Sequence, residues 1–134
     1  WEATGVLPAE PYRGIKAVVV TQNKEDVLNL ADIEFFDENG VNIASEASCW
    51  NLPAAQGGQY YVGGPDGEAP QANDGTPDTF THTGDGANLG KKVACVFPEP
   101  RALAKIKVLP RSGHWGRSNN LNLTLFDAIP DDYP

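Results

Sequence analysis

The strongest constraint on the fold is a series of short segments with strand-like side-chain patterns, separated by clusters of glycine and proline. In residues 120–126 (NLNLTLF), three leucines alternate with Asn122 and Thr124, which is the pattern of a strand with one buried face. Residues 14–21 (GIKAVVVT) are rich in β-branched side chains, which favour strands. The 14 glycines and 11 prolines favour turns over long helices. The chain is therefore expected to be a single all-β domain.

Four further segments are predicted as strands: residues 28–37 (LNLADIEFFD), 41–45 (VNIAS), 92–97 (KVACVF) and 102–109 (ALAKIKVL). In the first of these the apolar positions change phase between Leu30 and Ile33, so a strand with an irregularity in its middle is expected. A helix is the competing interpretation of that segment.

The remaining segments are predicted to lack regular structure. Residues 49–78 are rich in glycine and proline and are expected to form a long loop, of the kind that is usually functional or held by a metal. Residues 1–11 are expected to be an arm or a linker remnant. We count residues 1–134 as one domain.

Composition argues against several functions. The chain has 10 basic and 18 acidic residues, a net charge of −8, which would repel phosphate backbones and anionic membranes. It has no nucleophile elbow, P-loop or paired-histidine metal motif, and we expect a non-enzymatic protein. The many carboxylates leave one enzymatic alternative open, a pair of carboxylates acting as acid and base.

Because the chain begins at Trp1 and lacks methionine, we expect it to be a processed form or a piece of a larger multidomain protein.

Cys49 and Cys95 are the two cysteines of the chain. One disulfide or two buried free thiols are both compatible with the sequence.

Three stretches, taken in order, resemble galactose-binding-like domains, the discoidin or F5/8 type C family. Residues 28–45 are similar to its "L-A-E-I-E-V" strand and following turn, and residues 71–83 to its "A-x-D-G" segment, which often ends in His-Thr. Residues 103–125 are similar to its "I-x-x-I-x-V-x-x-R" strand and the strand that follows. The resemblance implies a β-sandwich jelly roll that binds galactose-type or related sugars without catalysis. It also implies a secreted or cell-surface setting and a glycan or polysaccharide as the partner.

A structural Ca²⁺ site is expected from the same resemblance. Calcium takes six to eight oxygen ligands, many of them backbone carbonyls, and a glycine-containing loop can aim several carbonyls at one point. The family's metal-contacting acids correspond to Asp32 and Asp74, with further oxygens from Gln71, Thr76 and Thr83. A turn capped by Asp74, without any metal, is the alternative.

A sugar site needs an aromatic face to stack on the pyranose ring and planar donors for its hydroxyl groups. Residues 111–120 (RSGHWGRSNN) concentrate such side chains directly after a predicted strand. The candidate sugar-binding residues are His82, Arg111, His114, Trp115, Arg117 and Asn119, with Tyr60 and Tyr61 as an opposite wall. The family's fucose-binding F-type lectins carry an "R-x-D" motif, whereas this chain has Arg111-Ser112-Gly113.

Less specific roles remain open for the same residues. His82 would then cap loop backbone, and Trp115 would pack over the edge of the core. Trp50, next to Cys49, is predicted to fill the core. The rival functions are a protein- or membrane-interaction module of discoidin type and a structural spacer.

Overall fold

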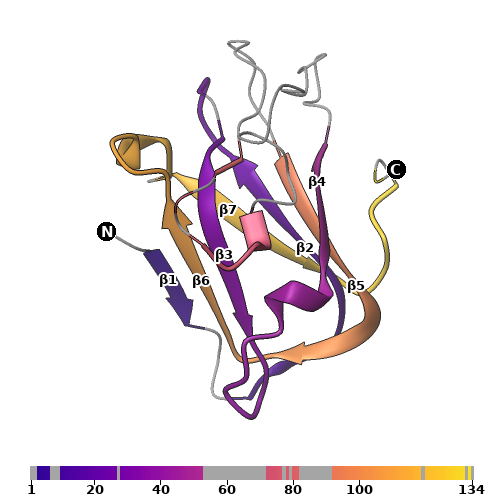
Figure 1. Ribbon diagram of the computed structural model, residues 1–134. Coiled ribbons are helices and arrows are strands. Elements are labelled where there is room, and N and C mark those ends of the chain that lie inside the picture. The colour runs from indigo at the N-terminus through magenta and orange to yellow at the C-terminus, as the bar shows by residue number, and fades with distance from the viewer. Residues whose placement is uncertain are drawn as a thin grey trace.

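The computed structural model describes residues 3–6, 10–26, 28–52, 72–76, 78, 80–81, 92–118, 120–131 and 133. Within these residues the chain forms seven strands (Figure 1). They are β1 (Ala3–Val6), β2 (Tyr12–Gln22), β3 (Leu30–Phe36), β4 (Ser48–Leu52), β5 (Lys92–Leu103), β6 (Lys105–Pro110) and β7 (Leu121–Phe126). Two short 3₁₀ helices, η1 (Ala44–Glu46) and η3 (Trp115–Ser118), lie in the connections. The expectation of an all-β chain is confirmed.

The strands form two antiparallel sheets. One has three strands in the order β1-β6-β3, and the other has four in the order β4-β5-β2-β7. Their buried side chains meet in a common hydrophobic cluster to which both sheets contribute. The rings of Phe35 on β3 and Phe97 on β5 pack edge to face, with the ring centres 5.4 Å apart. This contact of two fully buried aromatic side chains joins the two sheets at the centre of the core.

The alternation predicted for residues 120–126 holds in β7. Leu121 and Leu125 pack against the core, whereas Asn122 and Thr124 are exposed. Alternation places Leu123 on the same side of the strand as Leu121 and Leu125, but its side chain is 38% exposed.

The strand predicted over residues 41–45 is wrong. Asn42 makes a single bridge to Phe36, and a 3₁₀ helix follows at Ala44–Glu46. The reason is that side chains satisfy the backbone in place of a partner strand. Oδ1 of Asp37 accepts the N–H groups of Asn39 and Val41, and Oδ1 of Asn42 accepts those of Phe35 and Ala44.

Two segments expected to lack strands contain one each. Ala3–Val6, within the presumed arm, pairs with β6, and the presumed loop at residues 49–78 begins inside β4. Neither strand has a long enough alternating pattern to be found by periodicity. Residues 53–71 lie outside the described part of the chain.

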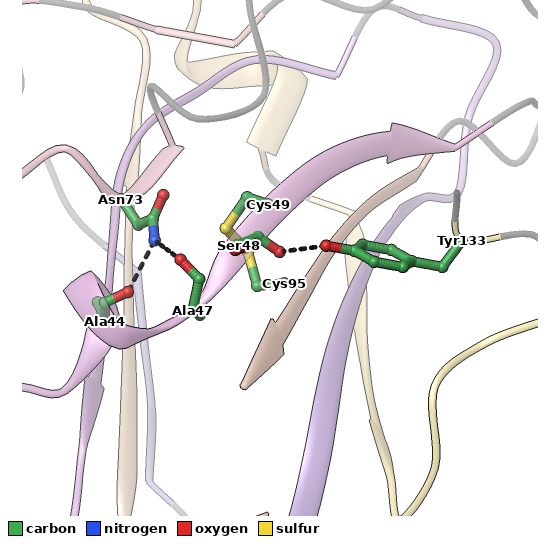
Figure 2. The surroundings of a disulfide bond; sticks show 7 residues. All are labelled: Ala44, Ala47, Ser48, Cys49, Asn73, Cys95 and Tyr133. Carbon is green, nitrogen blue, oxygen red and sulfur yellow. Dashed lines mark hydrogen bonds between the residues drawn. A yellow bond between two sulfur atoms is a disulfide. The ribbon is translucent and has the colours of Figure 1, made fainter. Parts of the chain in front are cut away.

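Trp50 does not fill the core, as was predicted from its position next to Cys49. Neighbouring residues of a strand point to opposite faces, and Cys49 takes the inward side of β4. The Trp50 side chain is therefore on the outer face, where it is 50% exposed. The C-terminal segment lies beside it, and the Tyr133 hydroxyl donates to the carbonyl oxygen of Ser48 at 3.1 Å (Figure 2).

The two cysteines form a disulfide. Cys49 and Cys95 are directly opposite each other on β4 and β5, both buried, with their Cα atoms 4.0 Å apart (Figure 2). This resolves the choice between a disulfide and two free thiols. The bond closes a ring with a sequence separation of 46 residues, and it holds β4 on the sheet at the point where the long connection begins.

Replacing both cysteines by alanine should lower the free energy of unfolding. Cross-linking a loop of this length restricts the unfolded chain, and such bonds typically contribute about 2–4 kcal/mol. Chemical denaturation of the double variant measures the loss, and wild-type protein under reducing conditions serves as its control. An unchanged denaturation midpoint in both samples would contradict the stabilising role.

Candidate functional site

The candidate metal site is built on an irregularity in β3. The pairing of β3 with β6 shifts between Leu30 and Asp32, so that two steps along β3 match one step along β6. This is a β-bulge, which changes the face that the following side chains occupy. Leu30 and Ile33 consequently both face the core, and Asp32 points to the outer side. The irregularity predicted from the change of phase between Leu30 and Ile33 is thus confirmed.

Asp32 faces a small polar cavity of about 100 Å³. Its side chain is 9% exposed, and its Oδ1 atom is buried without a hydrogen-bond partner. The remaining lining residues are Ile33, Asn42, Ala44, Ser45, Asn73, Asp74 and Gly75. Buried carboxylate oxygens are normally hydrogen-bonded or bound to a cation, so an unsatisfied one is the feature expected of an empty cation ligand.

The opposite wall of the cavity is the turn around Asp74. Gly75 has a φ of 82°, a left-handed conformation that glycine adopts without steric cost. Oδ1 of Asp74 accepts the N–H of Thr76 at 3.1 Å, and the Thr76 hydroxyl accepts the N–H of Asp78 at 3.2 Å. The capping role considered for Asp74 is therefore present, in a turn that also brings this carboxyl beside Asp32.

Asn73 attaches this turn to η1. Its Nδ2 donates to the carbonyl oxygens of Ala44 and Ala47 at 2.7 and 2.8 Å (Figure 2). Ala44 is the first residue of η1, and its carbonyl also accepts the N–H of Ala47, the residue that follows the helix. Asn73 was not among the predicted site residues, because it occupies the unspecified position of the "A-x-D-G" segment and only its contacts reveal the role.

The electrostatics of the cavity disfavour a charged Asp32. Burial raises the pKa of its carboxyl above the ordinary 3.8, and the negative charges of Glu34 and Asp74 raise it further. Backbone N–H groups of Ile33 and Gly75 lower the pKa in opposition, but the net shift is upward. A bound divalent cation would reverse this balance because it favours the charged carboxylate. Among the residues that the structure describes, no three acidic, histidine or cysteine side chains form a metal cluster, so carbonyl ligands would have to complete the coordination.

The raised pKa of Asp32 leads to a prediction for metal-free protein. A folded-state pKa above the unfolded value means that stability falls as the pH rises through it, so the ionised carboxyl opposes folding at neutral pH. Asp32→Asn should therefore melt at a higher temperature than wild type near about pH 7 in EDTA, and show little difference near about pH 3.

The control for this experiment is Asp78→Asn, which changes an exposed carboxyl in the same segment. If Asp32→Asn melted below wild type near neutral pH, the carboxylate would be stabilising and our account of the cavity would be wrong.

The segment that carries Asp74 continues along β3 to Phe80 and Thr81. Thr81 is fully buried and bridges to Leu30: its N–H donates to the Leu30 carbonyl at 2.8 Å, and its hydroxyl accepts the Leu30 N–H at 3.0 Å. Leu30 thus binds one end of this stretch of chain, and Asp32 lies beside its other end at Asp74 and Gly75.

Arg111 stacks on this stretch. Its guanidinium carbon lies 3.9 Å from the centre of the Phe80 ring, within the range of a cation–π contact. Phe80 is two positions before His82 in the sequence. The structure thus places Arg111 beside the segment that leads to His82. Phe80 was not among the predicted site residues, and only its contact with Arg111 reveals this position.

A partly buried polar network supports the loop after β6. Nη1 of Arg117 donates to Oδ1 of Asn29 at 2.6 Å, and its Nε lies 3.4 Å from a carboxylate oxygen of Asp26. Nε2 of Gln22 donates to the Arg117 carbonyl at 2.5 Å. Asn29 in turn donates to the carbonyl of Thr81 at 2.7 Å. Arg117, predicted to contact sugar, is here engaged in joining its loop to the connection between β2 and β3.

Arg117→Ala should destabilise the protein. The change removes a charge-assisted hydrogen bond to a buried amide, which is worth about 1.5–3 kcal/mol. Chemical denaturation measures the change, with Arg13→Ala as control because the ion pair of Arg13 with Glu38 is exposed and should contribute little. Equal effects of the two variants would argue against a stabilising network.

Trp115 opens the 3₁₀ helix η3 in the same loop and is 51% exposed. It does not pack over the core in the way that the alternative interpretation supposed. His114 is half-buried, and the N–H of Arg117 bonds to its carbonyl oxygen at 3.0 Å. The loop therefore presents an exposed indole while Arg117 anchors it.

Six predicted site residues lie outside the described part of the chain: Tyr60, Tyr61, Gln71, His82, Thr83 and Asn119. Of the others, Asp32, Asp74 and Thr76 are brought together, and Arg111, His114, Trp115 and Arg117 share one loop.

No protein-family model matches this chain, and no curated protein matches it significantly. No described helix is long and apolar enough to cross a membrane.

Proposed function

We propose that this chain is a non-catalytic carbohydrate-binding module with the galactose-binding-like jelly-roll sandwich, stabilised by one Ca²⁺ ion. The observation that carries the proposal is the stacking of Arg111 on Phe80 beside a loop with an exposed Trp115. A guanidinium held flat by an aromatic ring presents its N–H groups in a fixed plane, as recognition of neighbouring sugar hydroxyls requires. An exposed indole supplies an apolar face for the sugar ring.

The proposed calcium ion would occupy the cavity between Asp32 and Asp74. The unsatisfied Oδ1 of Asp32 and the raised pKa of its carboxyl support this assignment, because a hard cation removes both costs. The side chain of Thr76 and carbonyl oxygens of the surrounding turns are further candidate ligands. The ion would have a structural role and no part in a reaction.

The two sites are connected through β3. Asp32 faces the turn at Asp74, and Leu30 binds Thr81, next to the ring on which Arg111 stacks. Fixing the turn with an ion would hold Phe80 and Thr81 against β3. Calcium is therefore expected to strengthen sugar binding without touching the sugar.

A glycan array tests the proposed function, with labelled protein in calcium and again in EDTA. We expect binding to a narrow group of galactose-type or related glycans, weakened in EDTA and reduced at least tenfold, or about 1.4 kcal/mol, by Arg111→Ala or Trp115→Ala. Trp50→Ala is the matched control, because Trp50 is equally exposed, at 50%, but belongs to β4 and not to the loop that carries Trp115. Silence of folded protein across the array, or equal losses in the Trp50 and Trp115 variants, would overturn the proposal.

The calcium assignment has a test that does not involve sugar. Calcium should raise the melting temperature of wild type and of Asp78→Asn, and should leave Asp32→Asn unchanged. A calcium shift that persists in Asp32→Asn would place the ion elsewhere.

The alternative is a protein- or membrane-interaction module, and the exposed Trp115 is the feature that favours it. Binding of the same protein to anionic vesicles, lost in Trp115→Ala, would identify this alternative. The net charge of −8 argues against it.

A further inference from the structure

Asn122, Leu123 and Thr124 form a triplet of the kind that accepts N-linked glycans. Such a triplet has Asn first, any residue but proline second, and Ser or Thr third. It occurs once in the 134 residues of the chain, and it lies within β7, in the described part of the structure. Because so short a motif also arises by chance, the structural setting of the three residues decides its significance.

The acceptor side chain lies on the solvent side of β7. Asn122 and Thr124 are both exposed, whereas Leu121 and Leu125 on the opposite side of the strand pack against the core. β7 is the last strand of its sheet, and none of the described strands pairs with its outer edge. A glycan on Asn122 would therefore extend into solvent and would displace no core residue.

The hydrogen bonding of Asn122 is compatible with a glycan on its amide nitrogen. A side-chain amide nitrogen has two hydrogen atoms. The Nδ2 atom of Asn122 donates to Oδ1 of Asn23 at 3.2 Å, in an exposed contact. Glycosylation replaces one hydrogen and leaves the other, so this bond can be kept. The folded chain thus needs no rearrangement to carry the modification.

The disulfide is an independent sign of the compartment in which N-linked glycans are attached. Both cysteines of the chain, Cys49 and Cys95, are joined in it. Disulfides form and persist in oxidising compartments such as the lumen of the endoplasmic reticulum, and they are rare in the cytosol. Asparagine is glycosylated in secreted proteins that pass through this same lumen. The disulfide and the triplet therefore agree with each other.

The strand that carries the triplet is also one that a glycan would protect. Proteins usually guard open strand edges with charged residues, proline or bulges. The sequence LNLTLF has no charged residue and no proline, and its register with β2 has no bulge. Leu123 and Phe126 are 38% and 37% exposed on this strand. A bulky, hydrophilic glycan on Asn122 would hinder the approach of another chain.

We propose that Asn122 is the acceptor of an N-linked glycan. The co-reactant is an oligosaccharide linked to a lipid pyrophosphate. Nδ2 of Asn122 forms a bond to the anomeric carbon of the first sugar and loses one proton. The bond from that carbon to the pyrophosphate oxygen breaks, and the lipid pyrophosphate leaves with the electron pair. The glycan is a covalent modification, separate from the proposed binding of a free glycan in the loop that carries Trp115.

Secretion of the full chain from a eukaryotic cell line, behind a cleavable signal, tests the acceptor by intact mass. Wild type should carry the mass of an oligosaccharide, which peptide N-glycosidase removes. Asn122→Gln and Thr124→Ala should lack the glycan, whereas Thr124→Ser keeps the hydroxyl and should retain it. Asn39→Gln changes an exposed Asn outside the triplet and is the matched control, with the glycan unchanged. Secreted, folded wild type without a glycan overturns the proposal, as does a glycan that persists in Asn122→Gln.

Thermal unfolding tests whether the folded chain accommodates the glycan. Glycosylated and enzymatically deglycosylated wild type should melt within about 3 °C of each other, because Asn122 is exposed and changes at exposed positions have small effects. Both samples should keep the Cys49–Cys95 bond. Glycosylated protein that is recovered only unfolded, with free thiols, would contradict the placement of the glycan on the solvent side of β7.

Discussion

The bulge between Leu30 and Asp32 determines which side chains of β3 face the core and which face the 72–81 segment. With regular alternation, Asp32 would share the inward face of Leu30, and a carboxylate would be buried among aliphatic side chains at a cost of several kcal/mol. The extra residue directs Asp32 outward while both Leu30 and Ile33 remain in the core. The cavity at Asp74 and the bridge to Thr81 both depend on this arrangement.

The features that the sequence predicted well are those with a local cause. Alternation in residues 120–126 and the β-branched run at 14–21 correspond to strands β7 and β2, and the change of phase in residues 28–37 corresponds to the bulge. In each case side chains within one segment report which face is buried. The pairing of Cys49 with Cys95 has no such local cause, because it depends on the register of two strands that are distant in sequence.

The wrong predictions concern residues whose placement depends on their contacts and not on their own side-chain type. Val41–Ser45 looked like a strand because it contains Val and Ile, but the side-chain oxygens of Asp37 and Asn42 already satisfy the neighbouring backbone. Trp50 was expected in the core because it is next to Cys49, whereas the inward position of Cys49 in the disulfide sets Trp50 on the opposite face of β4. At the candidate sites, residue types were informative about chemistry. The positioning roles of Asn73, Phe80 and Asn29 required three-dimensional contacts that no spacing reveals.

The disulfide also has a consequence for resistance to proteolytic damage. Cys49 and Cys95 enclose the glycine- and proline-rich connection within a covalent ring. A protease that cuts any one peptide bond inside this ring leaves a single covalent molecule, in which the two new ends are still joined through the sulfur atoms. The segments on either side of the cut, β4 and β5, would remain paired at the position of the bond. A nicked domain would thus keep both halves of its four-stranded sheet together until it met a reductant.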